Sequence, residues 1–102
     1  MHPNEAMEEV IGGKRYSVKA ATLIASDERW DGSNWERNGR NTFLYRTPNG
    51  AYFTVQLSQW QGERDSLTPI TQAEAIELYE QSLSEHAVSY AEAFPEVTLT
   101  DA

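Results

Sequence analysis

The 102-residue sequence predicts an α+β domain: a three-stranded antiparallel meander packed on one face by one or two C-terminal helices. Three observations predict this fold class. Residues 40–60 alternate apolar and polar side chains around a strong turn signal, which indicates a β-hairpin. A helix-start signal follows at Thr71. An isolated hairpin is marginal in water, so a third strand is needed beside it.

The hairpin turn is Thr47-Pro48-Asn49-Gly50. Proline presets φ at the second turn position, and glycine accepts the positive φ of a closing bulge. A three-residue loop of this kind places Arg46 opposite Tyr52. One face, expected to be the core side, then carries Phe43, Tyr45, Phe53, Val55 and Leu57. The other, expected to be at least half exposed, carries Arg40, Thr42, Leu44, Arg46, Tyr52, Thr54, Gln56, Ser58 and Trp60.

The N-terminal third is less regular. Residues 1–13 are expected to form a flexible arm ending in two glycines, and residues 14–102 a single α+β domain. Residues 14–26 fit either a strand or a helical turn, and the need for a third strand favours a strand from about residue 20 to 26. Residues 27–41 are polar and glycine-punctuated, which predicts a loop.

The C-terminal part begins with a connecting loop over residues 61–70. Thr71 as N-cap and Glu74 three residues later form a capping box, which predicts a helix start. A shorter second helix is expected over about residues 85–93, and Pro95 ends it.

Three anchor segments carry a resemblance: Lys14-Arg15-Tyr16, Leu44-Tyr45-Arg46-Thr47-Pro48-Asn49-Gly50-Ala51-Tyr52-Phe53 and Pro69-Ile70-Thr71-Gln72-Ala73-Glu74-Ala75. Together they resemble a family of small uncharacterised bacterial proteins over about residues 14–95. The shared motifs are turn and cap chemistry, and the Trp-containing loop is longer here. No activity is established for that family, so the resemblance implies no catalytic residue.

Charge is divided unevenly along the chain. The net charge is −8, and all eight Lys and Arg lie in residues 1–64 with eight of the sixteen acids. The remaining eight acids therefore fall in residues 65–102, where no cation balances them. This distribution disfavours direct nucleic-acid binding, which needs clustered cations, and permits a basic partner. The absence of a targeting or membrane-spanning segment predicts a cytoplasmic protein.

The residues offer little for catalysis. The sequence has no cysteine, and His2 and His86 have no second histidine at metal-ligand spacing. No serine has a G-x-S-x-G context, and Glu74 and Glu77 are expected on a solvated helix face. We therefore expect no enzymatic activity, no cofactor and no metal.

Binding is the better hypothesis. The exposed hairpin face would present Arg40, Arg46, Tyr52, Gln56 and Trp60, joined by Trp30 and Trp35 from the loop. Aromatic and arginine side chains are typical of interface hot spots, so we expect a protein partner or self-association. For this face itself a structural interpretation is favoured over a partner surface, with Arg46 and Tyr52 an ordinary cross-strand pair. The alternatives are a sugar-like ligand on Trp30, Trp35 and Trp60 with Asn34, Asn41 and Gln61, or an acidic nucleic-acid mimic that binds a basic protein.

Overall fold

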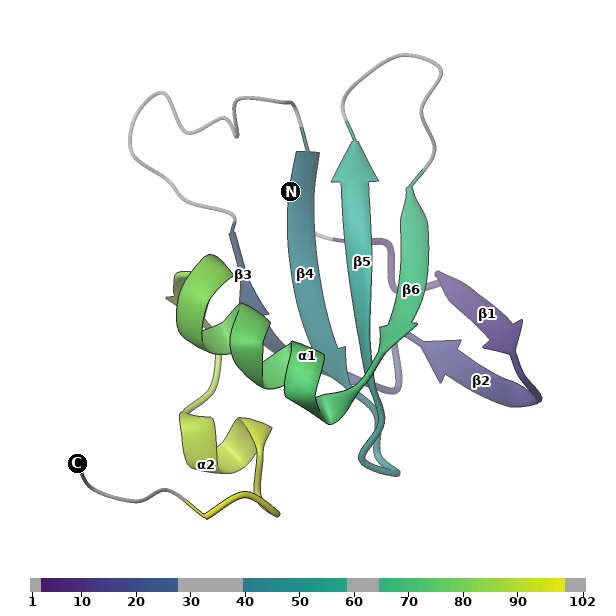
Figure 1. The fold of residues 1–102 in the computed structure, drawn as a ribbon. Helices are drawn as coiled ribbons and strands as arrows, with labels where there is room; N and C mark the ends of the chain where they lie inside the picture. Colours follow the sequence, from purple (N-terminus) through teal and green to yellow (C-terminus); the bar gives the residue numbers. More distant parts are fainter. Residues whose placement is uncertain (1–2, 28–39, 59–64, 99–102) are drawn as a thin grey trace.

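The computed structural model describes residues 3–27, 40–58 and 65–98. Its strands are β1 (Glu8–Ile11), β2 (Lys14–Ser17), β3 (Thr22–Ser26), β4 (Arg40–Arg46), β5 (Tyr52–Ser58), β6 (Ser66–Ile70) and β7 (Glu85–His86). Within the described ranges, five of them form an antiparallel sheet in the order β6-β5-β4-β3-β7. Strands β1 and β2 form a separate two-stranded sheet beside β6 (Figure 1).

The predicted fold class is wrong in the extent of the sheet and in how it is covered. A five-stranded sheet and a second, two-stranded one replace the three-stranded meander. Both faces of the central pair β4–β5 are covered, whereas we expected one face to stay largely exposed. The helical segments lie on the face of Leu44 and Tyr52, which is the face predicted to be exposed.

The hairpin itself is confirmed. Strands β4 and β5 pair with Arg46 opposite Tyr52 and Phe43 opposite Val55, as predicted. The Gly50 N–H donates to the Thr47 carbonyl at 2.9 Å, and the Thr47 N–H donates to the Ala51 carbonyl at 2.8 Å. Gly50 has φ +87°, the left-handed conformation that glycine adopts without steric cost. The turn therefore sets the register as its sequence predicts.

The helical cover consists of short segments. Helix α1 (Gln72–Glu77) continues into a π-helical turn, η1 (Leu78–Ser82), and α2 (Tyr90–Ala93) is a single turn. The capping box is confirmed, because Thr71 Oγ1 accepts from the Glu74 N–H and Glu74 Oε1 accepts from the Thr71 N–H. The expected second helix over 85–93 is partly wrong: Glu85 and His86 form β7, and α2 begins only at Tyr90.

Two hydrophobic clusters lie on opposite faces of the sheet. The helical side joins Ile24, Leu44 and Tyr52 of the sheet to Tyr79 and Phe94, with Phe94 fully buried. The other side buries the predicted core residues Phe43, Tyr45, Phe53, Val55 and Leu57. Leu67 of β6 extends this face, and Tyr16 and Val18 cover it in place of the helices. The sheet is therefore the middle layer between the helical segments and the N-terminal part of the chain.

Besides β7, three strands of the described residues lie where the sequence predicts no strand: β1, β2 and β6. Residues 61–70 were predicted as a loop, yet β6 pairs with β5 and forms the sheet edge, where Pro69 is tolerated. Strand β1 lies within residues 1–13, expected to be a flexible arm, and pairs with β2. Strand β2 lies in the part of residues 14–26 where no strand was favoured, whereas β3 confirms the strand expected from about residue 20 to 26.

Candidate functional site

The predicted binding residues are divided between the interior and the surface. Tyr52 is only 3% exposed, and its hydroxyl donates to the Ala93 carbonyl at 2.9 Å. Its ring lies 5.4 Å from that of Phe94, centroid to centroid. Tyr52 thus ties the sheet to α2 and is not presented to a partner. Gln56, on the same face, is exposed.

Arg46 is half-buried beside the turn. Its Nε is buried and has no hydrogen-bond partner, while its Nη2 lies 3.5 Å from the position that a Cβ on Gly50 would take. The carboxylate Oε1 of Glu96 lies 3.9 Å from that same position. Arg46 and Glu96 therefore both lie near Gly50, and Arg46 is only partly exposed.

The other predicted binding residues contribute little to a site in the described part of the chain. Trp30, Trp35 and Trp60 lie outside the described residues, as do Asn34, Gln61 and the side chain of Arg40. Asn41 is 7% exposed and donates through its amide to Asp27 Oδ1 at 3.3 Å. The same carboxylate oxygen accepts from the Thr42 N–H at 2.8 Å, so Asp27 fixes the start of β4. Asn41 is therefore buried and bonded to Asp27, and it is not presented to a ligand.

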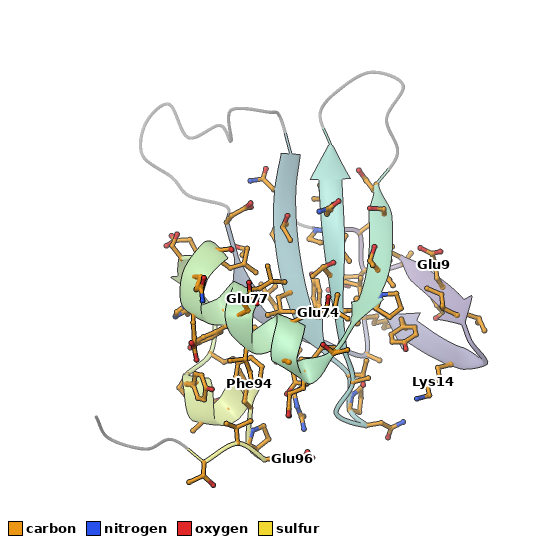
Figure 2. The ribbon with its side chains drawn as sticks, viewed as in Figure 1. Glu9, Lys14, Glu74, Glu77, Phe94 and Glu96 are labelled. Carbon is orange, nitrogen blue, oxygen red and sulfur yellow. The ribbon has the colours of Figure 1, made fainter. Side chains whose placement is uncertain are left out.

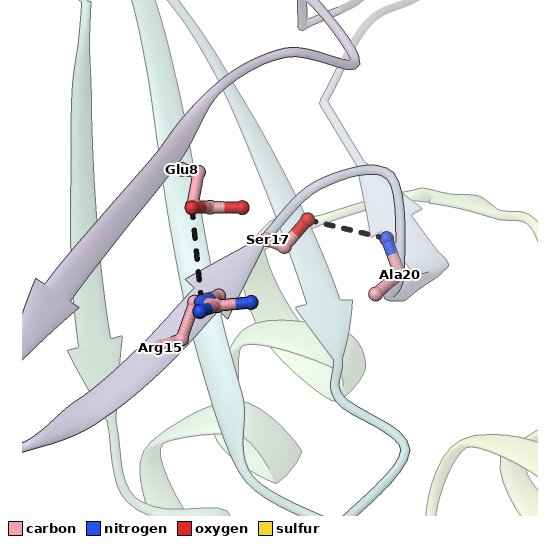
Figure 3. A network of polar contacts seen from close by, with 4 residues as sticks. All are labelled: Glu8, Arg15, Ser17 and Ala20. Carbon is pink, nitrogen blue, oxygen red and sulfur yellow. Dashed lines mark hydrogen bonds and ion pairs between the residues drawn. The ribbon is translucent and has the colours of Figure 1, made fainter.

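The β1–β2 hairpin is the most exposed apolar element described. Every residue of β1 is exposed, with Val10 at 68% and Ile11 at 36%. The register sets Val10 opposite Arg15 and Ile11 opposite Lys14. Strand alternation therefore places Glu8, Val10 and Arg15 on one face and Ile11, Lys14 and Tyr16 on the other. Figure 3 shows Arg15 Nε 3.8 Å from Glu8 Oε2 on the first face.

This hairpin was missed although the sequence contains a signal for it. Gly12 and Gly13 have φ +60° and +79°, and two glycines between apolar-containing runs are a recognised two-residue hairpin loop. The run EEVI contains two charged residues, and this composition favoured the prediction of a flexible arm. The turn dipeptide was the stronger signal.

A cavity of about 520 Å³ lies between this hairpin and the β4–β5 turn. The first hairpin contributes Lys14, Arg15 and Tyr16 to its lining, and the β4–β5 turn contributes Thr47 and Asn49. The two turns come from segments more than thirty positions apart in the sequence, so no local pattern could indicate the cavity.

The helical layer carries only negative charge. The acids of its helical segments and of the chain beside them are all exposed: Glu74, Glu77, Glu80, Glu85, Glu92 and Glu96. Asp65, the seventh exposed acid of the described residues 65–98, directly precedes β6. Figure 2 shows Glu74 and Glu77 on α1 and Glu96 beyond α2, with Lys14 on the separate hairpin. Hydrogen bonds from the Thr71 backbone and side chain lower the pKa of Glu74. Glu74 is therefore ionised in its role as part of the helix cap.

His86 has a structural environment. Its Nε2 lies 2.8 Å from the Tyr79 carbonyl oxygen, which can only accept, so Nε2 carries the proton. Its ring stacks on that of Tyr79 with centroids 3.8 Å apart. Burial, followed by the nearby Glu92 charge, raises the pKa of Tyr79, whose hydroxyl donates to the Val88 carbonyl. These contacts lock β7 against η1.

The described residues form neither a metal-binding cluster nor a membrane-spanning helix. Across residues 3–27, 40–58 and 65–98, no cluster of three or more His, Cys, Asp or Glu could hold a metal ion. None of the helices in these same ranges has the length and apolar character needed to cross a membrane.

Comparisons with protein-family models, curated proteins and solved structures find no significant match to this chain.

Proposed function

We propose that this protein is a non-enzymatic interaction module that self-associates through the outward face of the β1–β2 hairpin. The observation that carries the proposal is the exposure of Val10, 68%, on a hairpin that forms a sheet of its own. Exposed apolar surface rimmed by polar residues marks contact sites in proteins, and Val10 lies on one hairpin face with the charged Glu8 and Arg15. This hairpin replaces the β4–β5 face as the contact element, because Tyr52 is buried.

The distribution of charge favours a second copy of the chain as the partner of this hairpin. Residues 5–19 carry three acids, Glu5, Glu8 and Glu9, and three cations, Lys14, Arg15 and Lys19, so this region is neutral. The described residues 65–98 carry seven exposed acids and no cation. Two copies of a chain with net charge −8 repel least where their surfaces are neutral. A twofold contact uses the same patch twice, and a patch with an apolar centre and charges of both signs at its rim is self-complementary.

The test is the mass of the protein in solution, measured by sedimentation over a wide range of concentrations. The wild type should rise from 11.5 kDa towards twice that mass as concentration increases. Val10→Lys places a charge at the apolar centre and should remain monomeric. Arg15→Glu makes the rim uniformly acidic and should shift the midpoint to higher concentration.

Thr22→Lys is the matched control, because Thr22 is also an exposed β-branched strand residue and lies outside the hairpin. It should dimerise like the wild type. A wild type that stays at 11.5 kDa at every concentration would remove self-association as the function, and equal losses in Val10→Lys and Thr22→Lys would remove the hairpin as the contact.

A second candidate function is binding of a basic protein by the acidic helical layer. Six exposed acids, with no Lys or Arg among the described residues 72–98, favour it: Glu74, Glu77, Glu80, Glu85, Glu92 and Glu96. Glu74→Gln, Glu77→Gln and Glu80→Gln together should weaken salt-sensitive capture of a basic protein such as a histone. Capture that is insensitive to salt, or unchanged in the triple variant, would contradict this function.

A further inference from the structure

The cavity between the two hairpin turns has a lining that differs from the rest of the described surface. None of the residues that line it is acidic, although the chain has a net charge of −8. Four Lys and Arg side chains lie in the described part of the chain, Lys14, Arg15, Lys19 and Arg46, and two of them border this cavity. Its volume of about 520 Å³ suits a small-molecule ligand.

Hydrogen-bond donors without partners line the cavity from both sides. Within the described part of the chain, the Lys14 ammonium forms no ion pair, and the Asn49 amide forms no hydrogen bond. The Tyr16 hydroxyl also lacks a partner there, although Tyr16 is only 8% exposed. Among the described residues, Arg46 Nε is the buried side-chain polar atom without a partner, so the Tyr16 hydroxyl keeps access to solvent and can donate to a ligand in the cavity that Tyr16 lines.

Arg15 contributes differently from Lys14. It borders the cavity, yet strand alternation directs its side chain to the face opposite Lys14, where it lies 3.8 Å from Glu8. The unpaired positive charge at the cavity is therefore that of Lys14. Replacing Lys14 alone therefore tests the unpaired charge at the cavity, because the neighbouring Arg15 has Glu8 as its partner.

The walls of the cavity are held in place before any ligand arrives. Tyr16 packs edge-on against Phe53 with centroids 5.8 Å apart, which anchors β2 to the sheet. Thr47 Oγ1 accepts from the Ala51 N–H at 3.0 Å and so fixes the turn that carries Asn49. A site whose donors are already positioned loses little conformational entropy on binding.

We propose that this cavity binds the oxyanion group, phosphate or carboxylate, of a small anionic molecule. Lys14 supplies the charge, and the Asn49 amide and Tyr16 hydroxyl supply hydrogen bonds. The contact differs from the proposed self-association, because Lys14 and Tyr16 lie on the hairpin face opposite Val10.

The experiment is an NMR titration of the ¹⁵N-labelled full chain with inorganic phosphate and, separately, with succinate, using sodium chloride at equal ionic strength as reference. Both anions should shift the amide signals of Gly13, Tyr16, Asn49 and Ala51, and whichever binds more tightly identifies the source of the oxyanion. Lys14→Gln should weaken binding about tenfold, the effect expected for loss of one charge-assisted hydrogen bond. Asn49→Asp keeps a turn-forming residue and adds a repelling carboxylate, so it should abolish the shifts.

Lys19→Gln is the matched control, because it removes the same charge from an exposed lysine that does not line the cavity. It should leave the affinity unchanged. Equal weakening in Lys14→Gln and Lys19→Gln, or shifts spread over all cations, would show only nonspecific screening and overturn the proposal. An absence of shifts with both anions would overturn it as well. Val10→Lys, which should prevent self-association, should bind the anion as the wild type does. The two proposals can therefore fail independently of each other.

Discussion

The hydrogen bond from Tyr52 to Ala93 gives a quantitative test of how the helical layer is attached. Tyr52→Phe keeps the ring that packs 5.4 Å from Phe94 and removes only the hydroxyl that donates at 2.9 Å. The net value of a neutral hydrogen bond is about 1 kcal/mol, and an unsatisfied buried carbonyl adds to the cost. We expect a loss of about 1–2 kcal/mol in the free energy of unfolding, and about 4–8 °C in Tm per kcal/mol.

Tyr45→Phe is the control, because Tyr45 is 5% exposed, stacks on Phe53 and forms no hydrogen bond through its hydroxyl in the described part of the chain. It should change the free energy of unfolding by about 0.5 kcal/mol or less. Urea denaturation followed by circular dichroism measures both variants. Equal losses in Tyr52→Phe and Tyr45→Phe would refute the reasoning. So would an unchanged Tyr52→Phe midpoint accompanied by faster hydrogen exchange in α2 alone, since the layer would then open without the sheet.

Three further stability measurements follow from single features of the fold. Thr71→Ala removes the N-cap of α1 and should cost about 1 kcal/mol in urea denaturation, whereas Gln72→Ala, one residue later, should cost far less. Gly50→Ala forces φ +87° on a residue with a Cβ and should cost about 1–2 kcal/mol, with a smaller loss for Gly50→Asn. Burial raises the pKa of Tyr45 to about 12, above its ordinary 10.0, so the unfolded chain loses this proton first. Stability should therefore fall as pH rises from 10 towards 12, and Tyr45→Phe should show a shallower fall.

The sequence predicts local features well where one short segment determines them. Thr47 to Gly50 specify both the turn and the strand register, because the bend is closed by hydrogen bonds within the loop. Thr71 and Glu74 specify the helix start for the same reason. Elements that depend on a distant partner are predicted poorly: β7 exists because Glu85 and His86 pair with β3, and their own sequence favours no strand.

The face of β4 and β5 that contacts the helical segments was wrongly predicted to be at least half exposed. Alternation of side chains identifies a buried and an exposed face only when one of the two faces is polar. Leu44 and Tyr52 lie on the supposedly exposed face, yet both bury their apolar surface beneath the helical segments. A strand pair covered on both sides lacks the clean apolar–polar contrast of a half-exposed one. Arg46 contributed to the error, since its charged end suggested an exposed face although its Nε is buried.

The candidate sites are harder to predict than the fold for a related reason. Lys14 and Asn49 face one cavity only because Tyr16 docks on Phe53 and so brings two hairpins together. Neither residue has a sequence neighbour that signals binding, and Lys14 and Lys19 look equivalent in the sequence. These two lysines differ because Lys14 lines a cavity without carboxylates and Lys19 does not, and that cavity exists only in the folded chain. Folding also places Glu74 to Glu96 in and beside the helical segments. Charge segregation along the chain thus becomes separation in space, and it leaves the N-terminal hairpin as the neutral region where a second copy or an anion can approach with least repulsion.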